Sequence, residues 1–186
     1  MKKESNNINL QEKENEIEKQ KIGNESLITK LKNINLNDKK NKRLEVYISD
    51  SYDKNNNIRY YGGYIKFNEL IETIEGEVND DIYSKSGSGG AILFGCEKVI
   101  NIALMSEVKI LDIFSSQLYI SKIMKNEWEK KSGSSKKFAE FVNSKKQEIE
   151  LHLYYLQKEN DKMKMAQDIA KKAAHLKYIN YRKLYK

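Results

Sequence analysis

Hydrophobic residues change their spacing along the chain, and each change marks a different expected element. Two stretches, 44–52 and 58–68, are rich in Val, Ile, Tyr and Phe, which favours β-strands. The polar segment DKNNN between them is typical of a hairpin-like turn. A third strand is expected around residues 70–78. The first part of the pattern therefore predicts three consecutive strands.

After the third strand, apolar residues recur at the three- and four-residue spacing of helices. A glycine-rich segment, SKSGSGG, breaks the chain before the first of them. The expected elements are helix 91–105, strand 108–114, helix 116–128, helix 136–147, strand 149–156 and basic amphipathic helix 161–179. The strand at 108–114 has helices on both sides, which is the pattern of a crossover unit in an α/β protein.

Residues 1–43 differ from the rest because they carry Lys, Glu and Asn throughout and few large apolar side chains. Gly23 and Asn24 interrupt a weak helical stripe of aliphatic residues. The stripe consists of Ile17, Ile22, Leu27, Ile28, Leu31 and Ile34. We therefore expect a charged extension at 1–43, flexible or partly helical, in front of one folded domain at 44–186. A solvated tail and a partner-binding helix are both open interpretations of this segment.

The composition limits the classes of partner and of site. With 34 Lys and Arg against 27 Asp and Glu among 186 residues, the formal net charge is +7. This charge permits nucleic-acid partners through phosphate neutralisation, although a lysine-rich chain without proline is equally expected from an AT-rich genome. The single Cys96 excludes an internal disulfide and is expected to be a buried structural thiol. Two distant histidines provide no zinc-like cluster.

No membrane-spanning segment is expected, because apolar runs such as 99–105 are shorter than the roughly 20 residues that a span requires. Segment 1–16 contains basic residues but lacks the apolar stretch of a secretory signal. We therefore expect a cytoplasmic protein with no membrane contact. The sequence gives no indication of the oligomeric state.

Three segments, found in the same order as in one known family, carry a sequence resemblance. YISDSY at 47–52 and DIAKKAA at 168–174 resemble the Y-I-D-G-S-Y opening strand and the A-D-x-L-A-K-K-A C-terminal helix of bacterial type I ribonuclease H. KIMKNEWEKKSGSSKKFAEFV at 122–142 resembles its central helix, loop and next helix, and is the most specific match. The resemblance covers roughly 44–175. It implies an RNase H-like fold, with a mixed five-stranded sheet flanked by helices.

Enzymes of this family hold two Mg²⁺ ions with four carboxylates, and such hard cations require anionic oxygen ligands. The resemblance places the four ligand positions on Ser49, Ala91 (or a neighbour), Ser116 and Gln167, none of which is acidic. In addition, Gln157 stands near the position of a histidine that the family carries before the last helix. We therefore expect no metal, no cofactor and no hydrolysis, that is, a pseudoenzyme.

Asp50 and Asp168 each lie one residue beyond an expected ligand position. A slip of one residue on a strand turns the side chain to the other face of the sheet, and on a helix it rotates the side chain by about 100°. We therefore expect both carboxylates to point away from the site. A divergent active nuclease, rescued by one or both of them, is the residual alternative.

Basic residues beside the predicted loop and in the last helix are candidate contacts to nucleic acid. They are Lys125, Lys130, Lys131, Lys136 and Lys137 around the loop after Trp128, and Lys171, Lys172 and Arg182 in the last helix and tail. Exposed lysines are also common as merely solubilising groups. Trp128 is either a stacking platform or a packing residue.

Two functions of different classes follow from these expectations. In the first, the domain binds an RNA-containing duplex through shape and backbone contacts without cleaving it. In the second, it is a protein-interaction scaffold or inhibitor, encoded by a phage or plasmid, that associates with a nucleic-acid-processing protein complex. The salt dependence of duplex binding distinguishes the two, because a complex driven by phosphate contacts weakens steeply as salt rises.

Overall fold

A computed structural model describes residues 23–34, 43–124 and 133–184, with the side chains of the last helix described as far as His175. The strands are β1 Arg43–Asp53, β2 Ile58–Phe67, β3 Leu70–Glu77, β4 Ile110–Ser115 and β5 Glu150–Tyr155. The helices are α2 Asp81–Ser84, α3 Gly87–Met105, α4 Leu118–Met124, α5 Gly133–Lys145 and α6 Asp161–Leu184, in addition to a helix at 23–34. The predicted order of elements is confirmed, with α2 and the helix at 23–34 as additions.

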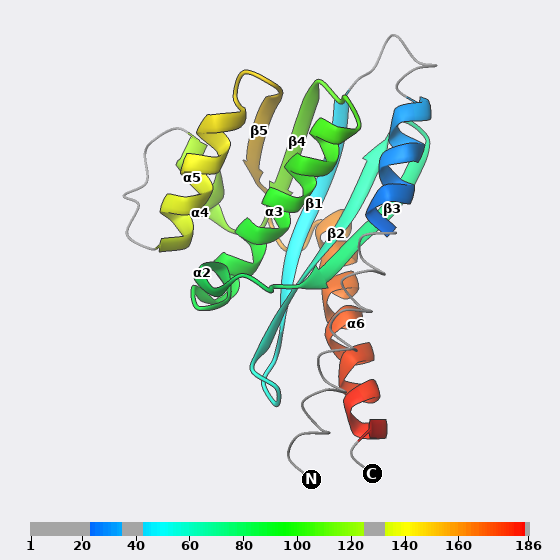
Figure 1. Ribbon diagram of the computed structural model, residues 1–186, viewed down its shortest axis with the longest axis vertical. Coiled ribbons are helices and arrows are strands. Elements are labelled where there is room, and N and C mark those ends of the chain that lie inside the picture. The colour runs from blue at the N-terminus through cyan, green and yellow to red at the C-terminus, as the bar shows by residue number, and fades with distance from the viewer. Residues whose placement is uncertain (1–22, 35–42, 125–132, 185–186) are drawn as a thin grey trace, which may run out of the picture.

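The five strands form one mixed sheet in the order β3-β2-β1-β4-β5. β1, β2 and β3 pair antiparallel as successive hairpins, whereas β1 pairs parallel with β4 and β4 pairs parallel with β5. Helix α6 packs on one face of the sheet, against β1, β2 and β3, and α3 packs on the other face (Figure 1). The predicted fold class, a mixed five-stranded sheet flanked by helices, is confirmed.

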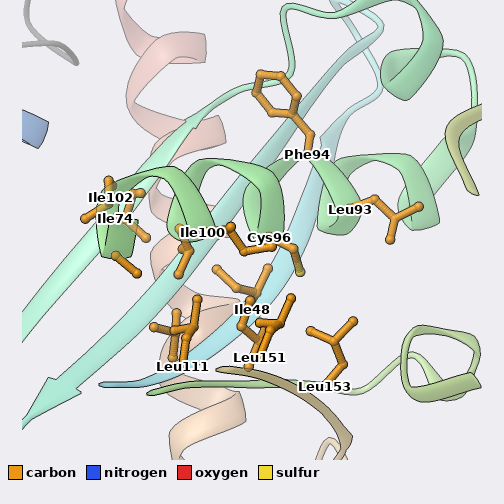
Figure 2. Packing of buried hydrophobic residues seen from close by; sticks show 14 of the residues in the cluster. Ile48, Ile74, Leu93, Phe94, Cys96, Ile100, Ile102, Leu111, Leu151 and Leu153 are labelled. Carbon is orange, nitrogen blue, oxygen red and sulfur yellow. The ribbon is translucent and has the colours of Figure 1, made fainter. Parts of the chain in front are cut away.

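Side chains of the central strand β1 alternate between the two faces, as the two-residue period of a strand requires. Val46 and Ile48 point into the main core beneath α3, where Figure 2 shows Cys96 and Ile100 directed towards the sheet. Tyr47 points to the other face and belongs to a smaller cluster beneath α6. The next residue on that face is Ser49, so β1 presents a hydroxyl to α6 at the point where its apolar run ends.

The close contact between α6 and the sheet depends on Gly62 of β2, which pairs with Ser49 of β1. A β-carbon added at Gly62 would lie 2.3 Å from the backbone nitrogen of Ala170 in α6. Only a residue without a side chain therefore lets the helix approach this closely. The contact fixes the height of α6 above β1 and thus the position of the α6 side chains that face Ser49.

Helix α3 begins earlier than its apolar pattern indicates. The segment expected as a break forms its first turn, with Gly87 at a φ of +70°. By length and composition α3 is apolar enough to cross a membrane, but eleven of its 19 residues are buried in the domain. It is the core helix of the fold. Cys96 within it is fully buried, as predicted, and burial raises the pKa of its thiol to about 12.

The helix at 23–34 corrects the expected boundary between extension and domain. Gly23 and Asn24 do not interrupt this helix, because both are helical in the described part of the chain. Leu27, Ile28 and Leu31 are buried in the main core cluster, so this part of the chain belongs to the domain. The helix runs beside β3 (Figure 1). Residues 1–22 and 35–42, including the other predicted members of the extension, lie outside the described part of the chain.

Candidate functional site

The candidate site is built around a bond between the first strand and the last helix. The Ser49 hydroxyl donates a hydrogen bond to Gln167 Oε1 over 3.0 Å, and Gln167 Nε2 donates to the backbone carbonyl of Asp50 over 2.9 Å. Ser49 is only 2% exposed. Both ends of the Gln167 amide are therefore occupied by β1. Two residues 118 positions apart, both predicted as site positions, meet through neutral groups.

Beside this bond lies an open cavity of about 280 Å³. Its walls come from β1, the segment after β4, the loop between β5 and α6, and one face of α6. The lining residues are Ser49, Ser116, Lys158, Met163, Lys164, Gln167, Asp168 and Lys171. Three of the four predicted ligand positions, Ser49, Ser116 and Gln167, therefore converge on one cavity, just beyond the point where the parallel pairing of β1 with β4 ends.

The fourth predicted position, Ala91, does not reach the cavity. It is fully buried in the main core under α3. The α3 residue that approaches β1 at this end of the sheet is Ser88, almost one turn earlier, whose hydroxyl donates to Asp50 Oδ1 over 3.2 Å. The expected register differs from the observed one because the second half of the glycine-rich segment, 87–90, forms the first turn of α3 instead of preceding the helix.

Asp50 lies on the face of β1 opposite to Ser49, as the alternation of a strand predicts. Its carboxylate faces Ser88 of α3 rather than the cavity beneath α6. Burial raises the pKa of the Asp50 carboxyl, and the hydrogen bond from Ser88 and the charges of Arg59 and Lys158 offset only part of this effect. The carboxylate is thus held in a partly desolvated place and is not among the residues that line the cavity.

The expectation that Asp168 points away from the site is wrong, because Asp168 lines the cavity. The cavity follows a face of α6 that is wide enough to include neighbouring positions at 164, 167, 168 and 171, the three- and four-residue spacing of one helix surface. The Asp168 side chain is 76% exposed, and its carboxylate lies 3.6 Å from Lys171 Nζ. It stands on the rim, paired with a cation.

The donor set of the cavity does not fit a pair of divalent ions. Mg²⁺ is held through carboxylate and phosphate oxygens, but the floor here offers the hydroxyls of Ser49 and Ser116 and the amide of Gln167. Asp168 is the one carboxylate in the lining, against three lysine ammonium groups that repel a metal cation. Among the described residues, no three His, Cys, Asp or Glu side chains form a group that would hold a metal ion.

Solved structures of ribonucleases H have the same architecture. RNase H1 of the archaeon Halobacterium salinarum matches with a TM-score of 0.58 and 9% identity, covering 70% of this chain and 96% of that protein. LC11-RNase H1 from a compost metagenome, in complex with an RNA/DNA hybrid, matches with a TM-score of 0.59 and 11% identity, covering 73% and 99%. The N-terminal RNase H domain of a Mycobacterium tuberculosis protein matches with a TM-score of 0.57 and 10% identity, covering 72% and 96%. The chain has an RNase H-like fold.

At identities of 9–13% these similarities establish the RNase H-like fold and leave the activity open. No protein-family profile and no curated protein matches the sequence. The sequence resemblance at the first strand and the last helix is consistent with this fold, since Ser49 and Gln167 are brought together by it.

The predicted basic residues of the RNase H-like domain occupy different surroundings. Lys136 is exposed on α5, whereas Lys137 forms an ion pair with Asp80 and lies over the ring of Tyr83. Lys171 lines the cavity, and Lys172 is exposed on α6. Lys125, Trp128, Lys130 and Lys131 lie outside the described residues, as does the side chain of Arg182, whose backbone belongs to α6.

Lys158 and Lys164 line the cavity but were not among the predicted contacts. Lys164 precedes Gln167 by three residues and Lys171 follows it by four, so the helical period alone places both beside Gln167. That signal was present in the sequence. Lys158 lies in the loop before α6, and nothing in its sequence surroundings indicates that the loop turns towards β1.

Proposed function

We propose that this protein binds the sugar–phosphate backbone of an RNA-containing duplex and does not cleave the duplex. The observation that carries the proposal is the cavity beneath α6, where neutral side chains stand at three of the positions that the resemblance assigns to metal ligands and three lysines border them. With a single carboxylate in the lining, Asp168, which is paired with Lys171, this cavity lacks the set of anionic oxygens that two-metal activation of water requires. The resemblance thus supplies the fold, and the residues present argue against hydrolysis.

Charge supports a nucleic-acid partner. The net charge of +7 favours association with phosphates, and three lysines gather on the cavity that the fold places at the end of the sheet. A structural neighbour, LC11-RNase H1, is described in complex with an RNA/DNA hybrid. We extend that class of ligand to this chain because a duplex recognised by shape and backbone needs cations and hydroxyls rather than metal ligands.

Binding of a labelled RNA–DNA hybrid, measured by fluorescence anisotropy in EDTA from 50 to 200 mM salt, tests the proposal. We expect saturable binding without metal, which weakens by about tenfold or more over this range as phosphate contacts release counterions. DNA duplex of the same sequence serves as the matched ligand and is expected to bind more weakly, because it lacks 2′-hydroxyls.

Absence of hybrid binding at the lowest salt would overturn the proposal. Stable association with a purified nucleic-acid-processing protein, unchanged over the same salt range, would then favour the scaffold or inhibitor interpretation.

A further inference from the structure

The cavity beneath α6 has a charge distribution that the loss of metal ligands alone does not require. Substitution of carboxylates by neutral groups would leave a neutral cavity, yet Lys158, Lys164 and Lys171 border this one. They come from two segments, the loop before α6 and one face of α6. Against them the lining holds a single acid, Asp168, so the formal charge of the lining is 3 − 1 = +2.

We infer that this cavity binds one backbone phosphate of the nucleic-acid strand, with lysine ammonium groups supplying the positive charge in place of divalent ions. The inference rests on the proposed function and names the group that the site recognises. Lysine binds phosphate as a mobile point charge, and three such charges around one small cavity favour a single anionic group such as the monoanionic phosphodiester of a strand. The hydroxyls of Ser49 and Ser116 complete a polar floor.

Acidic neighbours of the three lysines do not neutralise the cavity permanently. Lys171 Nζ lies 3.6 Å from Asp168, and Lys164 Nζ lies 3.3 Å from Asp161, with all four side chains more than half exposed. Such exposed pairs three residues apart on a helix are weak because water screens both charges, so a phosphate can replace the carboxylate partner. The charge of Lys158 also acts on the Asp50 carboxyl, where it offsets part of the rise in pKa that burial causes.

A phosphodiester within a strand fits this cavity better than a free phosphate ion. The lysines are exposed on the rim and none is buried, so each contact to a small ion is weak and strongly hydrated. A nucleic-acid strand binds such cations more strongly than a free phosphate ion does, because its neighbouring phosphates release condensed counterions on binding. The volume of about 280 Å³ is below the usual range of sites that enclose small organic ligands, roughly 300–1,000 Å³.

The test compares two triple variants of the full chain that lose the same charge. One carries Lys158→Gln, Lys164→Gln and Lys171→Gln at the cavity. The control carries Lys32→Gln, Lys109→Gln and Lys146→Gln, three exposed lysines that do not line the cavity. We expect the cavity variant to lose at least about tenfold in hybrid affinity relative to the control, and its plot of log K against log salt to become flatter by about 1, the value for one phosphate contact.

Further measurements test whether the bound group is a strand phosphate and whether the lysines act through their charge. A series of hybrids each carries one neutral methylphosphonate, at a different position in the strand. The wild type should bind one member of the series more weakly than the others, whereas the cavity variant should bind all members equally. The triple variant Lys158→Arg, Lys164→Arg and Lys171→Arg should retain affinity, because it keeps the three positive charges. Inorganic phosphate at constant ionic strength should compete poorly.

The outcomes separate this inference from the proposed function. If the wild type binds hybrid but the cavity and control variants have equal affinities and salt slopes, the phosphate site is wrong and the binding function stands. Tight competition by inorganic phosphate would show a small-ion site and overturn the strand assignment. If the wild type binds no hybrid, both fail together.

Discussion

Ser49 and Asp50 are neighbours in β1, yet the two faces of the strand at this point have opposite character. On the α6 face the Ser49 hydroxyl is buried and bonded to the Gln167 amide, beside a cavity bordered by lysines. On the α3 face the Asp50 carboxylate is partly buried and accepts a hydrogen bond from Ser88. Because the two residues are one position apart in the strand, the acid at 50 lies on the opposite face of the sheet from the expected ligand position at 49.

This difference shows that whether a carboxylate can reach the site depends more on the face of its strand or helix than on its distance in sequence from an expected ligand position. Asp50 stands one residue from the expected ligand position, but its carboxylate faces Ser88 of α3, whereas Ser49 and Gln167 line the cavity beneath α6. Asp168 shows the reverse, because the broad surface of a helix allows neighbouring positions to share one cavity. A strand imposes a sharper choice of side than a helix does.

The largest expected effect comes from Gly62→Ala, which forces α6 away from the sheet. It therefore disturbs the packing on the face of β1 that carries Ser49, and leaves the α3 face unchanged. The added β-carbon would meet the Ala170 backbone at 2.3 Å, so we expect a loss of about 3 kcal/mol in the free energy of unfolding. Urea denaturation measures this loss. Gly23→Ala is the matched control, because its added β-carbon has nothing within 4 Å. Equal stability of the two variants would contradict the close contact between α6 and β2.

Gln167→Leu removes the amide that joins the two elements while keeping the size of the side chain. The buried Ser49 hydroxyl and the Asp50 carbonyl would each lose a partner, which we expect to cost about 1–2 kcal/mol in the free energy of unfolding. Gln157→Leu, at an exposed position in the loop before α6, is the control and should change stability little. The bond would be unimportant if both variants unfolded at the same urea concentration.

Asp50→Asn is expected to have the smallest effect and to act only on the α3 face. Because burial raises the pKa of Asp50 in the folded state, the folded protein holds this proton more tightly than the unfolded chain. Its contribution to stability is therefore favourable at low pH and is lost as pH rises through the folded pKa. Asn carries no charge at any of these pH values, so the variant avoids the cost of burying an ionised carboxylate. It should therefore melt at a slightly higher temperature than the wild type at pH 7.

Melting curves at pH 7 and at pH 3 check this prediction. The gain from Asp50→Asn should disappear at pH 3, below the ordinary pKa of an aspartate. Asp81→Asn, at an exposed residue of α2, is the control. A gain at pH 3 as large as at pH 7 would mean that the effect does not come from titration of Asp50. Hybrid binding should be retained by the variant, in contrast to the lysine variants of the cavity.

The sheet was predictable because its strands carry short, β-branched and aromatic runs, and the meeting of Ser49 with Gln167 follows from the resemblance at β1 and α6. The first turn of α3 was not, because SKSGSGG has the composition of a loop. In the fold a β-carbon at Gly90 would lie 1.9 Å from the Tyr83 carbonyl, so glycine there serves packing rather than flexibility. Tertiary contact overrides local preference at that turn.

The helix at 23–34 was hidden for a related reason. Leu27 and Leu31 form too narrow an apolar stripe to predict a stable helix in isolation, and their burial depends on a core supplied by residues far along the chain. At the cavity, the helical spacing of Lys164 and Lys171 around Gln167 was readable from the sequence. The position of Lys158 was not, because a loop path has no period.

Incubation of the wild type with an RNA–DNA hybrid in Mg²⁺ or Mn²⁺ tests most directly whether this fold has kept binding without hydrolysis. Products are separated on a denaturing gel, and binding of the same hybrid is followed in parallel by anisotropy. We expect saturable binding with an intact RNA strand in both metals, for the wild type and for Asp50→Asn alike. Metal-dependent cleavage by the wild type that is abolished in Asp50→Asn would contradict this and would identify Asp50 as a metal ligand.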